Sequence, residues 1–90
     1  MKLSIVFTKK FKKDFKRIEN RRKKTIQLKK IILSLTERKP LERNFLDHSL
    51  KGNFKDCREC HIEPDFLLIY KIVNETLILV RCGSHSELYE

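Results

Sequence analysis

The chain has 90 residues and lacks the features that mark disulfide-bonded, secreted or membrane-spanning proteins. Its three cysteines leave an odd thiol in any pairing scheme, so we expect free thiols rather than a disulfide framework. The longest uninterrupted apolar run covers residues 66–70 and is far shorter than the roughly 20 residues that a membrane span needs. Residues 3–7 are too few, and too closely followed by lysines, for a secretory signal. These absences favour a soluble protein of the cytoplasm.

Chain length and the absence of repeats limit the architecture. A domain of this size buries somewhat over ~60% of the surface that its unfolded chain exposes, which allows one modest core. The sequence contains no internal repeat and no low-complexity segment. We therefore expect a single domain over residues 1–90, with a shallow cleft rather than a large enclosed pocket.

The basic charge is concentrated in the first third of the chain. The net charge is +9, and residues 1–30 contain 13 Lys and Arg against two acidic residues, a net of +11. Residues 31–90 contain 8 basic and 10 acidic residues, a net of −2. A segregated basic surface favours a polyanion or an acidic protein as partner, because it neutralises phosphates or pairs with carboxylates. Charge alone does not choose between these partners.

Apolar spacing in residues 3–40 predicts a strand followed by two helices. The β-branched and aromatic run at residues 3–7 is typical of a strand, and Thr8 offers a side-chain oxygen for a helix N-cap. The basic residues 21–24 mark the turn between the helices, and Pro40 ends the second pattern. Two sets of apolar residues recur at helical spacing, namely Phe11, Phe15 and Ile18 in the first helix and Leu28, Ile31, Ile32 and Leu35 in the second.

Residues 41–90 are predicted to form a loop and then an antiparallel meander. Residues 41–54 lack clear periodicity, and we interpret them as a loop that carries Asp47 and His48. Strand-like segments follow at residues 56–62, 66–73 and 76–82, and the gaps between them are short enough for hairpins. Together these elements predict an α+β domain, in which an N-terminal strand, a two-helix hairpin and the meander form one unit with the helices on one sheet face.

All three histidines of the chain, His48, His61 and His85, lie in this second half together with Arg58, Asp65 and Arg81. Three groups that titrate near neutrality, one carboxylate and two guanidinium groups are the parts needed to cleave a phosphodiester without a metal ion. A short hairpin can bring residues 61 and 65 to the same end of the sheet. Residues 81 and 85 reach that end if the neighbouring strands pair in register.

Strand periodicity separates the side chains of residues 57–62. Residues 57, 59 and 61 are predicted to point to one face, and residues 58, 60 and 62 to the other. Arg58 is therefore interpreted as structural, because it points away from His61. The same alternation argues against a zinc site, since Cys57 and Cys60 cannot chelate one ion within a continuous strand. No metal site is predicted.

A joint motif is formed by three segments, Asp47–Gly52, Arg58–Tyr70 and Arg81–Tyr89. Together they resemble the YafQ branch of the RelE-type toxins, the toxin halves of bacterial type II toxin–antitoxin pairs. The resemblance implies a RelE-like, small microbial-ribonuclease-like fold. It also implies an mRNA interferase, an endoribonuclease that cleaves mRNA on the ribosome or free, inhibits translation and needs no cofactor.

The resemblance further implies partners. The expected partners are mRNA, the ribosome with its ribosomal RNA, and a cognate antitoxin that covers the active surface. We expect the toxin to be a monomer when free and part of a hetero-oligomer with its antitoxin. No membrane partner is expected.

The resemblance also implies which residues carry the reaction. The catalytic positions of the family fall here on His48, His61, Asp65, Arg81 and His85. In the implied mechanism a base removes the proton of the ribose 2′-hydroxyl, the oxygen attacks the adjacent phosphorus, and an acid protonates the departing 5′-oxygen. We assign His85 as general acid, Asp65 or His61 as general base, and Arg81 as the clamp on the charged phosphate, while His48 orients or handles a second proton.

RNA contacts are implied for two aromatic and several basic residues. Phe66 and Tyr89 occupy aromatic positions of the family, where some relatives have Trp and many have Phe, respectively. Base stacking survives such substitutions. The basic residues expected to hold the RNA backbone are Lys9, Lys10, Lys12, Lys13, Arg21, Arg22, Lys23 and Lys24.

Other interpretations stay open from the residues alone. Arg81 has a structural alternative, an ion pair with Glu59 across the strands, and Asp65 has one in the turn that precedes residue 66. At the level of function, the alternatives are a gyrase-inhibiting toxin of the same superfamily and a non-catalytic RNA-binding or partner-binding module.

Overall fold

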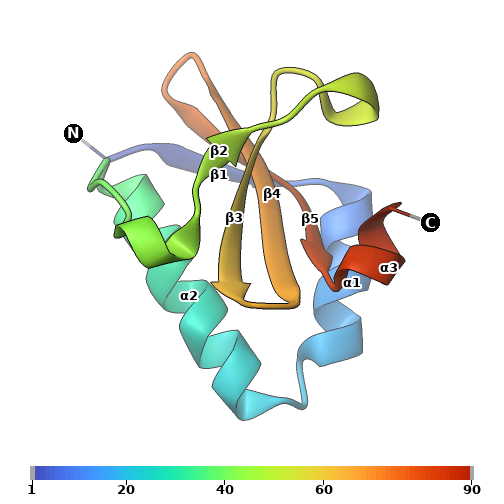
Figure 1. Cartoon of the computed structure of the whole chain (residues 1–90). Coiled ribbons are helices and arrows are strands. Elements are labelled where there is room, and N and C mark those ends of the chain that lie inside the picture. Colours follow the sequence, from blue (N-terminus) through green and yellow to red (C-terminus); the bar gives the residue numbers. More distant parts are fainter. Residues whose placement is uncertain (1, 90) are drawn as a thin grey trace.

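The computed structural model describes residues 2–89 and contains one mixed sheet of five strands with two long helices packed on one face (Figure 1). Within these residues, no helix is long and apolar enough to cross a bilayer. The elements in chain order are β1 (Ser4–Phe7), α1 (Lys9–Ile18), α2 (Arg22–Thr36), η1 (Arg43–Phe45), β2 (His48–Ser49), η2 (Gly52–Phe54), β3 (Arg58–Glu63), β4 (Phe66–Val73), β5 (Thr76–Gly83) and α3 (His85–Tyr89).

The strand order is β1-β5-β4-β3-β2, with β1 parallel to β5 and all other pairs antiparallel. The predicted α+β class, the helix pair and the meander of β3, β4 and β5 are confirmed. The prediction of a plain loop for residues 41–54 is wrong, because residues 48–49 pair with β3 as a two-residue edge strand. Helix α3 was also not predicted, since five residues are too few to show helical periodicity.

Helices α1 and α2 form where the sequence predicted them and bury the expected stripes. Thr8 caps α1, because its Oγ1 accepts a hydrogen bond of 3.0 Å from the backbone N–H of Phe11. The residues of α2 that face inward are Leu28, Ile31 and Leu35. They pack with Phe11 and the inward side chains of the sheet into the main core. This packing covers one sheet face. The helices α1 and α2 leave the other face uncovered.

The second sheet face carries a smaller apolar cluster. Leu67 and Ile69 of β4 and Cys57 are buried there, and Leu88 of α3 covers them. Because α3 is short, it covers only part of this face. The remaining part holds polar side chains of β2, β3 and the β5–α3 junction.

Phe66 belongs to the main core and is 1% exposed. The Nζ atom of Lys24 lies over its ring, 4.6 Å from the centroid. In this structure no face of the Phe66 ring is open to a base, so the predicted stacking of Phe66 on RNA is not supported by its position. The residue stands at the start of β4, where its side chain alternates inward with Leu68.

Replacement of Phe66 tests this placement. Phe66→Ala is expected to lower the free energy of unfolding by about 3–5 kcal/mol, because a buried ring is replaced by a cavity. Phe7→Ala is the matched control, since Phe7 is 47% exposed and its loss should cost far less. Urea unfolding followed by circular dichroism measures both. Equal costs for the two variants would contradict the core position of Phe66.

Candidate active site

The strand register places the predicted site residues in two neighbouring rows on the face that α1 and α2 leave open. In the first row, His48 pairs with Glu59, Glu59 with Ile69, and Ile69 with Arg81. The register of β4 and β5 shifts at a β-bulge directly beside Arg81, because Ile69 pairs with Arg81 but Tyr70 pairs with Leu79. Strands lie ~4.8 Å apart, so residues 48 and 59 are neighbours while residue 81 lies two strands from residue 59.

In the second row, His61 pairs with Leu67, and Leu67 with Gly83. The chain turns after Gly83 into α3, which begins at His85. The register therefore brings His85 toward His61, as the sequence predicted for paired strands. It does so across β4, which lies between them.

The three imidazoles form a line across this face. Ring centroids are 6.1 Å apart for His48 and His61, and 5.6 Å apart for His61 and His85. The Tyr89 ring continues the line, 6.4 Å from that of His85. The side chains of His48 and His85 are about half exposed, whereas that of His61 is 18% exposed. The predicted histidine cluster therefore exists and opens to solvent.

A buried carboxylate, that of Glu59, stands between two of these histidines. Its Oε1 atom lies 3.4 Å from Nε2 of His48 and 3.3 Å from Nε2 of His61. Its Oε2 atom accepts a hydrogen bond from the Tyr89 hydroxyl. Burial is the main cause that raises the pKa of the Tyr89 hydroxyl, and this hydrogen bond is the second. Glu59 thus contacts three site residues at once.

Glu59 was missed as a site residue, although strand alternation placed it on the face of His61. The signal was present in the spacing of residues 59 and 61, but the sequence did not show that β2 would bring His48 to the same carboxylate. The structure does not show the alternative pair between Glu59 and Arg81 among the residues it describes.

Hydrogen bonds orient the outer two histidines. Nδ1 of His48 is 2.6 Å from the carbonyl oxygen of Leu46, which can only accept, so this nitrogen carries a hydrogen and Nε2 faces Glu59. Oδ1 of Asp65 accepts from Nδ1 of His85 at 2.6 Å and from its backbone N–H at 2.9 Å. The Nε2 atom of His85 is thereby left as the nitrogen that can exchange a proton with a substrate.

The carboxylate of Asp65 is held ionised by the same contacts. The backbone hydrogen bond from His85 is the main cause that lowers the pKa of Asp65, and the hydrogen bond from the His85 side chain is the second. A lowered pKa means that this stabilisation is present above the ordinary aspartate pKa and is lost as the pH falls through the lowered value. Because Asp65 is exposed, solvent screens the interaction and its contribution to global stability is small.

The β5–α3 junction fixes the position of His85. The backbone N–H of Ser84 donates to Oε1 of Glu87 at 2.8 Å, and the backbone N–H of Glu87 donates to Oγ of Ser84 at 3.2 Å, which forms a capping box. Gly83 has φ +150°, and a Cβ at this position would lie 2.8 Å from Oε1 of Glu87. Glycine is therefore required for the capping box to close over this turn.

Two arginines are held by aspartates. Nε and Nη2 of Arg81 donate to the carboxylate of Asp14 at 2.6 and 3.0 Å, and these bonds raise the pKa of the guanidinium. Nε of Arg58 donates to Oδ1 of Asp47 at 3.1 Å, and the Tyr70 hydroxyl donates to the same oxygen at 2.8 Å. The structural interpretation of Arg58 is supported by these contacts.

Cys57, which directly precedes β3, and Cys60 within β3 lie on opposite faces of the sheet, because each belongs to a different apolar cluster. Burial raises the pKa of Cys60 to about 12, which keeps the thiol protonated. A different set of ligand atoms does converge, those of His48, Glu59 and His61, all within 4.8 Å of one another. Imidazole nitrogens and a carboxylate oxygen at these spacings suit a tetrahedral metal ion.

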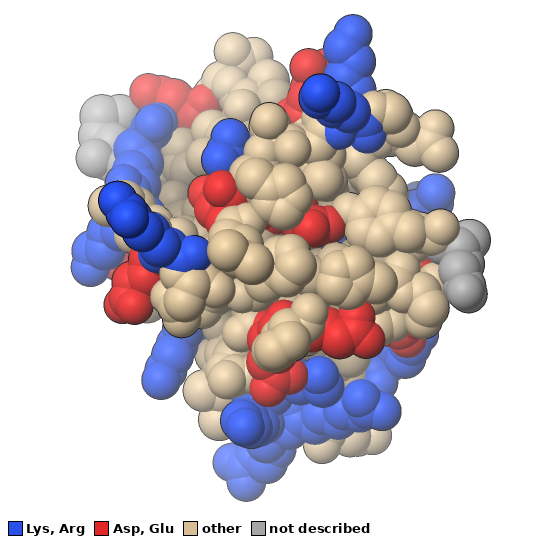
Figure 2. Space-filling view, viewed as in Figure 1, with Lys and Arg blue, Asp and Glu red and all other residues tan. Residues whose placement is uncertain are grey.

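Positive charge surrounds the site rather than filling it. Figure 2 shows Lys and Arg side chains along the rim of the viewed face, densest below, over the α1–α2 connection, and a centre of neutral and acidic side chains. A hollow of about 410 Å³ beside Asp65 is lined by Arg17, Arg21 and Lys24. A second hollow, of about 470 Å³, borders His61 beside η1. Of the predicted RNA-binding cations, Arg21 and Lys24 therefore lie next to the site.

Residues 3–90 match the profile of a family described as "Bacterial toxin of type II toxin-antitoxin system, YafQ". The chain belongs to the YafQ family. It is 35% identical over 86 residues, 94% of each chain, to a protein of Escherichia coli K12 named "mRNA interferase toxin YafQ". It is also 35% identical over 74 residues to a "Putative toxin YafQ" of Haemophilus influenzae, covering 79% of this chain and 72% of that protein.

Solved structures of YafQ and of a toxin from Helicobacter pylori have the same fold. YafQ from E. coli BL21(DE3) is 32% identical, with a TM-score of 0.89 and coverage of 98% and 99%. Its counterpart in the E. coli DinJ–YafQ toxin–antitoxin complex is 33% identical, with a TM-score of 0.88 and full coverage of both chains at 100%. A copper-bound mutant toxin from Helicobacter pylori is 44% identical, with a TM-score of 0.88 and coverage of 97% and 99%. These likenesses confirm the predicted fold and family.

Proposed function

We propose that this protein is an mRNA interferase toxin, a metal-independent endoribonuclease that cleaves mRNA on the ribosome and so inhibits translation. The observation that carries the proposal is the line of three imidazoles beside two carboxylates on the open sheet face. Relatives at 35% identity over 94% of the chain are named mRNA interferases. Because bacterial mRNA is translated in the cytoplasm, that is where the toxin would act.

The geometry supports a division of the proton transfers between His61 and His85. Their ring centroids are 5.6 Å apart, so both rings can reach oxygens of one phosphodiester. His85 acts as general acid through Nε2, and Asp65 orients its ring through Nδ1. His61 acts as general base. Asp65 is the weaker choice for that role, because its lowered pKa and engaged Oδ1 make it a poor proton acceptor.

The remaining site residues serve orientation and charge. Glu59 holds His48 and His61 with one oxygen atom, so both rings are set relative to each other. Arg81 stabilises the charge that develops on the phosphate. The products are a 2′,3′-cyclic phosphate and a 5′-hydroxyl.

RNA is held by stacking and by the surrounding cations. Tyr89 is 47% exposed, and its ring lies edge-on to Phe54 at a centroid distance of 5.7 Å. Since its hydroxyl is tied to Glu59, the ring is a fixed platform for a base. The hollows beside His61 and Asp65 offer a path for the strand, with Arg21 and Lys24 along one side. Such backbone contacts give affinity with little sequence readout.

Replacement of His85 tests the proposed function. His85→Ala should lower the cleavage rate by about 10²–10⁴-fold, the usual contribution of a general acid. Primer extension on a translated mRNA, with and without ribosomes and followed by end-group analysis, measures the breaks. Ser86→Ala on the same short helix is the control and should leave cleavage unchanged. Cleavage that is unaffected in His85→Ala would remove His85 from the mechanism.

A cognate antitoxin is the proposed protein partner, as in the DinJ–YafQ complexes. An apolar hollow of about 560 Å³ lies between α1 and α2. It is lined by phenylalanines, Leu28, Ile32 and Leu33 and bordered by three lysines and one acidic residue, Lys12, Lys16, Lys29 and Glu19. An amphipathic antitoxin helix with acidic flanks fits this combination, because its apolar face fills the hollow while its carboxylates meet the lysines. On this proposal, part of the antitoxin binds the helices, away from the open face on which the resemblance put it.

Two exposed positions of α2 test this surface. Leu33→Asp should weaken binding of the cognate antitoxin by tenfold or more, because Leu33 lines the hollow and a carboxylate there is unfavourable. Ile26→Asp is the matched control, since Ile26 is similarly exposed on α2 but does not line the hollow. Isothermal titration calorimetry measures both affinities. Equal losses, or none, would place the antitoxin elsewhere.

A second property, metal binding by the toxin, is favoured by the trio of His48, Glu59 and His61. Toxins of H. pylori with 44% and 46% identity are described as copper-bound and metal-bound. The separations of 3.4 and 3.3 Å between the nitrogens and Oε1 match neighbouring ligands of a tetrahedral ion. A metal ion here would occupy His61 and so compete with its role as a base.

Calorimetry with Zn²⁺ or Cu²⁺ tests the metal site. Glu59→Gln should weaken binding by tenfold or more, because it removes the anionic ligand. His85→Gln keeps the trio intact and serves as the control. If both variants bind as tightly as the wild type, the metal is held elsewhere, for example by surface groups.

A further inference from the structure

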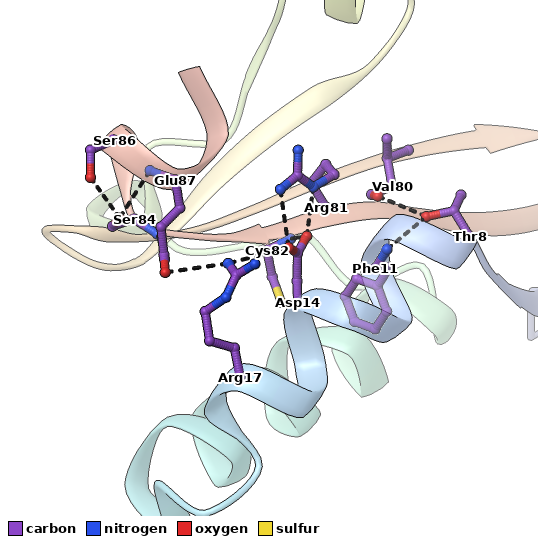
Figure 3. A network of polar contacts seen from close by, with 10 residues as sticks. All are labelled: Thr8, Phe11, Asp14, Arg17, Val80, Arg81, Cys82, Ser84, Ser86 and Glu87. Atoms are coloured by element: carbon purple, nitrogen blue, oxygen red, sulfur yellow. Dashed lines mark hydrogen bonds and ion pairs between the residues drawn. The ribbon is translucent and has the colours of Figure 1, made fainter. Parts of the chain in front are cut away.

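Strand β5 extends beyond its neighbour β1, and α1 with its N-cap completes the free edge of β5. The register of β1 ends with Phe7 opposite Leu79. Beyond that point, Thr8 donates its backbone N–H to the Leu79 carbonyl at 3.2 Å and its hydroxyl to the Val80 carbonyl at 2.8 Å. The backbone N–H of Cys82 donates to Oδ2 of Asp14 at 3.1 Å. The N-cap and a side chain of α1 thus replace the missing strand along this edge (Figure 3).

Asp14 also receives the guanidinium of Arg81. It is 2% exposed and stands on the inward stripe of α1, where the phenylalanine pattern predicts an apolar residue. Nε and Nη2 of Arg81 point at its two oxygens in the bidentate geometry of an arginine–carboxylate pair. The hydrogen bonds described for residues 2–89 use these two nitrogens and leave Nη1 of Arg81 without a protein acceptor.

The same carboxylate is linked to α3. Nη1 of Arg17 lies 3.5 Å from Oδ1 of Asp14 and 3.3 Å from Oε2 of Glu87. Glu87 in turn accepts from the backbone N–H of Ser84, immediately before His85. Figure 3 shows this sequence of contacts from α1 through the end of β5 to α3. Asp14 therefore stands at the junction of the two elements that present Arg81 and His85.

We propose that Asp14 is a positioning residue of the ribonuclease site, which holds the Arg81 guanidinium so that Nη1 faces the scissile phosphate. This inference rests on the proposed function. A lone arginine side chain has many rotamers, and its charge stabilises a developing anion only where it is held in place. The bidentate contact removes that freedom while sparing one end of the guanidinium for the substrate. Burial of Asp14 keeps water from competing for the contact.

A double-mutant cycle in the cleavage reaction tests the inference. Asp14→Asn keeps the size of the side chain and an oxygen for Cys82 but loses the charge. It should lower kcat at least tenfold and leave KM within about threefold, as expected for an interaction used in the transition state. In the Arg81→Lys background, Asp14→Asn should have no further effect, because its action passes through the guanidinium. The pH profile should keep its shape, since Asp14 transfers no proton.

The controls separate positioning from general stability. Ile31 of α2 packs in the main core, away from Arg81. Ile31→Val should therefore lower stability and leave kcat unchanged. Thermal unfolding of each variant shows that the assay temperature is below its transition. Suppose that the wild type is active. The positioning role is then overturned if Asp14→Asn cleaves at the wild-type rate, or if the losses of the two single variants multiply in the double variant. An inactive wild type would instead refute the ribonuclease function, and the inference with it.

Discussion

The register among β3, β4 and β5 is the constraint on which the open face depends. Side chains alternate between the two faces, so a slip of one residue would turn Glu59 and His61 toward the helices and bring Cys60 outward. The register holds because the inward set, which includes Cys60 and Leu68, is apolar and fully buried against the helices. A slipped sheet would expose these residues and bury a carboxylate without partners. Core packing thereby decides which residues can meet a substrate.

Three carboxylates, each on a different element, then orient the groups to which the proposed mechanism assigns chemical roles. Glu59 on β3 holds two histidines, Asp65 in the β3–β4 turn holds His85, and Asp14 on α1 holds Arg81. A carboxylate only accepts hydrogen bonds, so the contact with Asp65 means that Nδ1 of His85 carries a hydrogen, while the contact with Asp14 aligns two N–H groups of Arg81. The contacts differ in strength because Glu59 and Asp14 are buried, whereas Asp65 is exposed and screened by water.

The two faces of the sheet carry different kinds of surface. The helices fill one face and present an apolar hollow bordered by lysines, while the other face carries the histidines. An antitoxin helix seated on α1 and α2 would not by itself cover the imidazoles. Neutralisation would then require the antitoxin chain to continue round to the open face, or its bulk to keep the toxin away from the ribosome. The positive rim seen in Figure 2 is suited to either RNA or an acidic chain.

The sequence by itself determined the elements with strong periodicity. The stripes of α1 and α2, the alternation in β3 and the three meander strands follow from local spacing, because side chains of one period face one core. It also determined which residues carry titratable groups and which family the motifs resemble. The short elements β2 and α3 could not be read this way, since neither is long enough to show a period and both depend on contacts with the sheet.

Only the tertiary structure decided the partners of those groups. Phe66 looked like an RNA-stacking residue in the motif, but its position at the start of β4 turns it into the core. Asp14 is a buried acidic residue on the inward side of α1, and it binds an arginine 67 residues away. The physical reason is the same in both cases. A spacing pattern reports what a residue does along its own element, whereas a partner from a distant element is set by how the elements pack.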